Sequence, residues 1–298
     1  MLSISEQIKL GRLICPISKQ PLVLSDDGLV TNDGKHRYGF VNGVPILFSD
    51  KQVQEKYLNG SGKAMVEEYT SPSRFKSLLR KLATLGGDYR SQQSMAEFKA
   101  VIGAQPDDAL CLSIGGGPVR VDQKLINLNI GLFPNVDVVG DAYALPYADG
   151  SVDAIYCEAV LEHLEYPLHA VDEMWRVLRP GGQLYVITPF MQQYHGYPSH
   201  FQNYTITGHE RLFQRVGFDV ASRGVCVGPS VALFSLLVAY VRNFVPTRIL
   251  KGLMYVLLAI AGLPFRALDI FVNRHPSAYI LASTTYVRAI KPESAVAK

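Results

Sequence analysis

The chain reads ALCLSIGGGPVR over residues 109–120 and GDAYALPYADGSVDAIYCEAVLEHL over residues 140–164, and these two stretches decide the fold. Each holds a short apolar run that ends in small or polar residues. Between residues 107 and 227 such strand-like runs alternate with helix-like segments, of which the clearest is LHAVDEMWRVL (168–178), ended by RPGG. Strands that alternate with helices predict a doubly wound, mostly parallel α/β sheet covered on both faces.

Small and polar residues gather at the predicted carboxyl ends of four successive strands. A glycine cluster lets the backbone approach a ligand where any Cβ would collide, and open α/β sheets bind ligands outside this edge. The glycine spacing does not match G-x-G-x-x-G, so the cluster alone would also fit a simple turn. The residues expected at the edge are Gly115, Gly116 and Gly117, then Asn129, then Asp141 and Ala142, and finally Glu158.

Three stretches together resemble the class I S-adenosylmethionine-dependent methyltransferases of the type 11-like branch. They are CLSIGGGPVR (111–120), residues 140–164 and MWRVLRPGGQLYVITPF (174–190), within a resemblance that covers roughly residues 107–227. The resemblance implies a seven-stranded Rossmann-like sheet and S-adenosyl-L-methionine as cofactor. It assigns the glycines to the amino-acid part of the cofactor, Asn129 to the ribose, Asp141 with Ala142 to the adenine, and Glu158 to the cofactor and substrate side.

The chain departs from the family pattern at two positions. Ser113 stands where the first strand commonly carries an acid, and Asn129 replaces the ribose-binding acid. Asparagine keeps an acceptor oxygen but adds a donor and loses the charge, so we expect weaker ribose binding. The short interval between Gly115 and Asn129 also predicts that the first helix is abbreviated or missing.

Histidines cluster after the fifth predicted strand, in PFMQQYHGYPSHFQNYTITGHERLF (189–213). This stretch resembles a sub-branch of the family found with cell-surface glycan and lipid modification. A histidine suits removal of a proton from an acceptor hydroxyl, and His195 is the first candidate for this base and His200 the second. Tyr197 is a candidate positioning group. Structural loop histidines are the alternative for both, and His209 is expected at the surface.

The domain organisation is read from changes in composition. Residues 1–50 form a small β-rich unit that resembles the zinc-ribbon-like domain of methyltransferase activators, but only Cys15 remains and Ser18 stands where a second ligand would fall. We expect a metal-free remnant that serves packing or docking, and no metal site elsewhere. Residues 51–106 are read as a helical linker with a basic cluster, and residues 107–298 as the methyltransferase domain.

An apolar insertion, residues 228–275, precedes the last predicted strand (278–290). Its two apolar runs, 229–241 and 252–265, are each shorter than the roughly 20 residues that cross a bilayer. Three alternatives stay open: a buried helical hairpin, an interfacial membrane attachment favoured by basic flanks and aromatic residues, and a homodimer face.

Composition limits the remaining classes. The chain has 298 residues, 48% of them hydrophobic, and a net charge of +3, which does not favour a nucleic-acid partner. Four scattered cysteines and an N-terminus without an apolar run indicate a cytoplasmic protein, at most peripheral to the inner face of the membrane. We therefore expect a methyltransferase acting on a small-molecule, glycan or lipid-linked acceptor. The alternatives are a catalytically silent cofactor-binding scaffold and, less favoured, an RNA methyltransferase.

Overall fold

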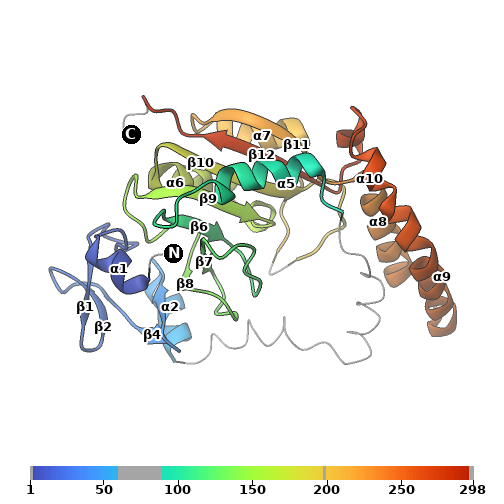
Figure 1. The fold of residues 1–298 in the computed structure, drawn as a ribbon. Helices are drawn as coiled ribbons and strands as arrows, with labels where there is room; N and C mark the ends of the chain where they lie inside the picture. The colour runs from blue at the N-terminus through green and yellow to red at the C-terminus, as the bar shows by residue number, and fades with distance from the viewer. Residues whose placement is uncertain (1–2, 60–88, 197–198, 295–298) are drawn as a thin grey trace.

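The computed structural model describes residues 3–59, 89–196 and 199–294, and Figure 1 shows their arrangement. Seven strands run in the order β11-β12-β10-β9-β6-β7-β8, with only β12 antiparallel to its neighbours, which confirms the predicted doubly wound sheet. The strands are β6 (Cys111–Ile114), β7 (Leu125–Asn129), β8 (Val138–Gly140), β9 (Val152–Glu158), β10 (Leu178–Pro189), β11 (Asp219–Val227) and β12 (Thr284–Ile290).

Helices cover both faces of this sheet, because the central strands are apolar on both sides. Leu112 and Ile114 of β6 pack on the face of α6 (Pro167–Val177) and α7 (Ile206–Gln214). Cys111 packs on the opposite face with residues of η1 (Lys99–Gly103), which continues α5 (Gln92–Phe98). The predicted helix at 168–178 is α6, and no helix separates β6 from β7, as the short interval predicted.

The N-terminal unit extends the same sheet. It comprises α1 (Ile4–Lys9), β1 (Leu22–Ser25), β2 (Gly28–Thr31), β3 (Arg37–Tyr38), β4 (Phe40–Val41), β5 (Val44–Leu47) and α2 (Lys51–Leu58). Strand β5 pairs in parallel with β8, so the sheet has nine strands where seven were expected. The Cys15 thiol lies 3.0 Å from the Tyr38 hydroxyl. The zinc-ribbon resemblance and the boundary at residue 50 stay predictions, and residues 60–88 of the linker, with its basic cluster, lie outside the described residues.

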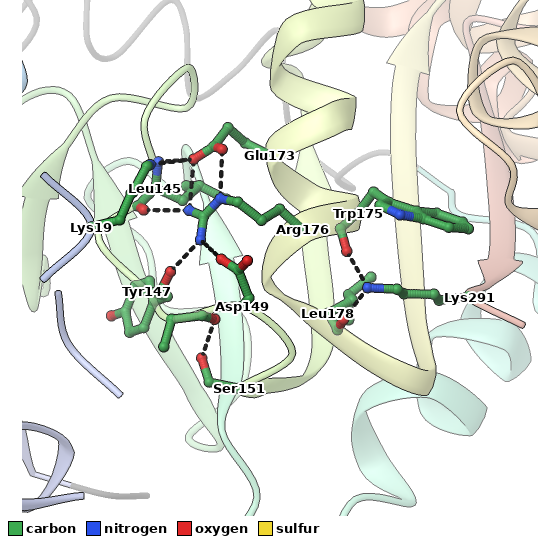
Figure 2. A network of polar contacts seen from close by, with 11 residues as sticks. Lys19, Leu145, Tyr147, Asp149, Ser151, Glu173, Trp175, Arg176, Leu178 and Lys291 are labelled. Atoms are coloured by element: carbon green, nitrogen blue, oxygen red, sulfur yellow. Dashed lines mark hydrogen bonds and ion pairs between the residues drawn. The ribbon is translucent and has the colours of Figure 1, made fainter. Parts of the chain in front are cut away.

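A network of ion pairs joins the N-terminal unit to α6 (Figure 2). Lys19 Nζ lies 3.3 Å from Glu173 Oε2, and Glu173 is paired with Arg176 one turn along the helix. Arg176 also donates to the carbonyls of Leu145 and Tyr147, at 2.9 and 2.7 Å. The loop between β8 and β9, which carries Asp141, is therefore fixed against α6.

The insertion forms a helical hairpin at the side of the sheet opposite the N-terminal unit (Figure 1). It contains α8 (Pro229–Phe244), α9 (Arg248–Ala267) and α10 (Asp269–Val272), and it connects β11 to β12, which pair with each other in the sheet. Helix α9 is longer than the apolar run 252–265 suggested. The expectation that this segment is too short to cross a bilayer was therefore wrong. Within the described residues one helical stretch, Arg248–Val272, is long and apolar enough to cross a membrane, and 19% of its apolar window is buried.

Candidate active site

A cavity of about 540 Å³ opens at the carboxyl ends of β6, β7, β8 and β9. This volume is in the usual range for a site that holds a small molecule. All seven residues predicted for the cofactor line it, and so does the first candidate base: Gly115, Gly116, Gly117, Asn129, Asp141, Ala142, Glu158 and His195. Their roles stay predictions, but the sequence-based expectation that these side chains meet at one edge agrees with their placement.

The glycine loop after β6 has no room for a side chain at its first two glycines, Gly115 and Gly116. Gly115 adopts a φ of +74°, and a Cβ there would lie 2.1 Å from Cγ2 of Val160. A Cβ on Gly116 would lie 2.6 Å from Oδ1 of Asn127, a buried oxygen with no hydrogen-bond partner among the described residues. The loop therefore presents bare backbone to the cavity, as close approach to a ligand requires.

Asn129 and Asp141 each already accept one backbone hydrogen bond at the cavity edge. Oδ1 of Asn129 already accepts the Gly131 N–H at 2.9 Å, so its amide nitrogen is the group free to donate to a hydroxyl oxygen. Asp141 accepts the Tyr143 N–H at 2.9 Å, and burial raises the pKa of its carboxyl above the ordinary value. The expectation that Asn129 supplies an acceptor for ribose hydroxyls is therefore only partly met by this geometry.

Glu158 is held by two side chains. Arg90, which precedes α5, lies 2.6 Å from Oε1, and the Tyr156 hydroxyl donates to Oε2. Arg90 also forms a backbone bridge with Val227, the last residue of β11. Sequence analysis missed Arg90, because nothing in residues 51–106 indicates which of its basic residues reaches the sheet.

A buried carboxylate lies behind two histidines that line the cavity. Glu162 has no exposed surface, and its Oε1 lies 3.7 Å from Nε2 of His163 and 3.7 Å from Nε2 of His195. Both histidines line the cavity. The carboxylate raises the pKa of His195 above its ordinary value. Sequence analysis missed Glu162, although it follows β9 and His195 follows β10, two strands that are neighbours in the sheet.

His200 does not line the cavity. Its Nδ1 accepts the His195 N–H at 3.1 Å, and its Nε2 lies 2.8 Å from Oδ1 of Asn203. With both ring nitrogens engaged, His200 has no lone pair left for an acceptor, and this geometry gives it a supporting position instead of a base. Tyr197 lies outside the described residues.

The expectation that His209 is exposed was wrong. His209 is fully buried on α7, where its Nδ1 lies 3.1 Å from Oγ1 of Thr285, and burial lowers its pKa to about 3. Its spacing to Leu212 and Phe213, at i+3 and i+4 on the buried face of the helix, is the signal that could have shown this.

Residues 119–186 match the protein family described as "Methyltransferase domain". This segment, which runs from the loop after β6 into β10, is thus similar to methyltransferase domains. A demethylmenaquinone methyltransferase of Renibacterium salmoninarum is 46% identical over 71 residues, 23% of this chain and 30% of that protein. The ubiquinone/menaquinone biosynthesis C-methyltransferase UbiE of Klebsiella pneumoniae is 38% identical over 113 residues, 35% of this chain and 44% of that protein. The chain thus spans less than half the length of these relatives.

A solved structure of phosphoethanolamine N-methyltransferase 2 of Haemonchus contortus, in complex with S-adenosyl-L-methionine, aligns with a TM-score of 0.45 at 13% identity. The alignment covers 91% of this chain and 71% of that chain. S-adenosyl-L-methionine is also the cofactor that the sequence resemblance implies for this cavity. The bare glycine loop and the adjoining polar residues of the cavity fit such a molecule, which carries a charged amino-acid part, a ribose and an adenine.

Proposed function

We propose that the protein transfers a methyl group from S-adenosyl-L-methionine to an apolar or lipid-linked acceptor. The single observation that carries the methyltransferase part is the common cavity, in which seven residues from four strand ends meet. A scaffold protein needs no such convergence of small and polar groups at one edge of its sheet.

On the cofactor side, each wall of the cavity suits one part of the molecule. The cofactor, when bound, supplies an electrophilic methyl group on a sulfonium centre. The glycine loop admits the amino-acid part, the Asn129 amide donates to a ribose hydroxyl, and Asp141 accepts from the adenine amino group. Glu158 is held in one position by Arg90, so its carboxylate would offer a fixed acceptor to the polar groups of the cofactor.

On the acceptor side, the protein mainly positions the nucleophile, since alignment with the methyl group supplies much of the rate. His195 Nδ1 lies 3.0 Å from the Gln193 carbonyl and donates to it, which leaves the lone pair on Nε2. That nitrogen lies at the cavity wall, where it accepts the proton of an acceptor hydroxyl.

The insertion supports an apolar acceptor. Strand β11 runs parallel to β10, so α8 starts from the same edge of the sheet as the cavity. Basic residues flank its exposed apolar side chains, as in helices that lie in a membrane interface. The exposed apolar side chains include Leu237, Tyr240, Phe244, Ile249, Leu253, Val256, Leu257 and Ile260. Relatives named for ubiquinone and menaquinone biosynthesis also point to apolar acceptors.

The proposal is tested with cofactor labelled in its methyl group. The full chain is incubated with labelled S-adenosyl-L-methionine and a total lipid extract, an aqueous metabolite extract or total RNA. We expect label in the lipid fraction and at least about a hundredfold less with His195→Ala. Label only in the aqueous extract or in RNA would overturn the apolar acceptor. Bound cofactor with no transfer to any fraction would favour the scaffold alternative.

A further inference from the structure

We propose that Glu162, His163 and His195 form a binding site for one divalent transition-metal ion, with zinc the best match, in the wall of the cavity. The ligand atoms are one carboxylate oxygen and the two Nε2 atoms, which all lie within 4.8 Å of one another. Two imidazoles and a carboxylate are a common three-residue set in zinc enzymes, where the fourth position is left for water or substrate.

The hydrogen bonds of the two histidines prepare them for a metal. Nδ1 of His163 lies 2.6 Å from the Ser199 carbonyl, and Nδ1 of His195 lies 3.0 Å from the Gln193 carbonyl. A carbonyl only accepts, so both Nδ1 atoms carry a proton, and in the neutral form of each ring Nε2 carries the lone pair. Metal-binding histidines usually have this arrangement, in which the second nitrogen donates to a backbone carbonyl.

The buried carboxylate is the second, independent observation. Glu162 has no exposed surface, and neither of its oxygens has a hydrogen-bond partner among the described residues. The two nearest nitrogens are 3.7 Å away, beyond hydrogen-bonding distance. A buried carboxylate without hydrogen bonds is strongly unfavourable, and a cation between the three groups would remove this cost.

The backbone around the site is fixed, so the three groups need little movement to close on an ion. The Phe201 N–H donates to the Glu162 carbonyl at 2.8 Å, which ties the segment after β10 to the turn after β9. Gln202 Nε2 adds bonds to the carbonyls of Leu161 and Leu164, at 3.0 and 2.7 Å. Ligands about 2.1 Å from a tetrahedral zinc are roughly 3.4 Å apart, close to the 3.7 Å seen here.

The position of the site suggests what the ion does. His163 and His195 line the same cavity as Gly116, so the open position of the ion faces the space left for the acceptor. An acceptor oxygen bound there would have a lowered pKa. In this case His195 serves as a ligand, and the ion takes over the activation of the acceptor that the proposed function gives to His195.

Metal content of the full chain tests this inference. Protein dialysed against excess Zn²⁺ and then against metal-free buffer is measured by elemental mass spectrometry, and we expect about one zinc per chain. Glu162→Gln and His163→Gln should each bind zinc at least about tenfold more weakly. His169→Gln, an exposed histidine of α6 outside the cluster, is the matched control and should keep full zinc content.

Cobalt binding is measured on the wild-type chain, so its result does not depend on whether the variants fold. Co²⁺ bound by the wild-type chain should show the intense visible absorption of a four- or five-coordinate site, and zinc should displace it. A folded wild-type chain without zinc, and with the weak spectrum of free Co²⁺, would overturn the inference. Occupancy is measured without cofactor, so zinc binding without methyl transfer would contradict the proposed function alone. Methyl transfer by a wild-type chain that takes up no zinc in the dialysis would contradict this inference alone.

Discussion

Gly115 is the residue at which the shape of the cavity is most sensitive to a single methyl group. An alanine Cβ there would collide with Val160 and would hold a left-handed backbone that costs roughly 1 kcal/mol. We predict that Gly115→Ala weakens S-adenosyl-L-methionine binding more than about tenfold in equilibrium dialysis, since the loop must shift into the site.

Gly43→Ala is the control for backbone strain. Gly43 has a φ of +79° with nothing within 4 Å of its Cβ position, so this variant should lose stability and keep its affinity. Adding Val160→Ala to Gly115→Ala should recover part of the affinity. Unchanged affinity in Gly115→Ala would show that the glycine loop does not contact the cofactor.

His209 makes the stability of the protein depend on pH. Its pKa is about 3 in the folded state and about 6.5 when exposed, so folding favours the neutral ring. This contribution is complete above pH 6.5 and is lost as the pH falls from 6.5 toward 3, at about 1.4 kcal/mol per pH unit. Between pH 6.5 and 5, we predict that the free energy of unfolding of the wild type falls by about 2 kcal/mol more than that of His209→Gln.

Urea unfolding at a series of pH values measures this difference. His275→Gln, which replaces an exposed histidine, should follow the wild-type curve. Parallel curves for the wild type and His209→Gln would mean that His209 is exposed or already charged in the folded protein.

At the scale of elements, the C-terminal end of α6 is held by one lysine, Lys291, which directly follows β12 (Figure 2). Lys291 donates to the carbonyls of Trp175 and Leu178, both at 2.7 Å, and its Nζ lies 5.1 Å from the centre of the Trp175 ring. We predict that Lys291→Met lowers the free energy of unfolding by about 1.5–3 kcal/mol, because two carbonyls at a helix C-terminus lose a charged donor.

Chemical denaturation of Lys291→Met measures that loss. Lys51→Met, at an exposed position of α2, should change stability by less than about 0.5 kcal/mol. Equal behaviour of the two variants would show that the Lys291 contacts do not stabilise the helix end.

The sequence predicted those strands and helices of the sheet whose positions follow from their order along the chain. Parallel strands bring their carboxyl ends to one edge, so Gly115, Asp141 and Glu158 could be grouped before any coordinates were considered. The pairing of β5 with β8 could not be predicted, because edge pairing depends on how the N-terminal unit docks. The approach of His195 to Glu162 also could not, because it depends on the path of the irregular segment that follows β10.

At the scale of the whole molecule, the insertion gives the protein one distinctly apolar side. Phe244 and Ile249, at the turn between α8 and α9, are 70% and 88% exposed, with Arg242 and Arg248 beside them. Burial of such side chains is worth about 1.5–3 kcal/mol each, and basic residues add attraction to anionic lipid.

We predict that the full chain floats with anionic liposomes and that the double variant Phe244→Asp/Ile249→Asp binds them at least about tenfold more weakly. Leu24→Asp, at an exposed apolar position of β1 on the opposite side of the molecule, is the control and should float like the wild type. A chain that stays in the soluble fraction with doubled mass in light scattering would indicate a dimer face and contradict membrane attachment.

The central claim is that the edge formed by β6, β7, β8 and β9 holds S-adenosyl-L-methionine. Isothermal titration calorimetry of the folded wild-type chain with this cofactor tests it most directly. We predict saturable heat with one site per chain and a dissociation constant in the micromolar range or tighter, on the order of −8 kcal/mol. No heat of binding at high protein concentration, with the fold intact by circular dichroism, would contradict the account.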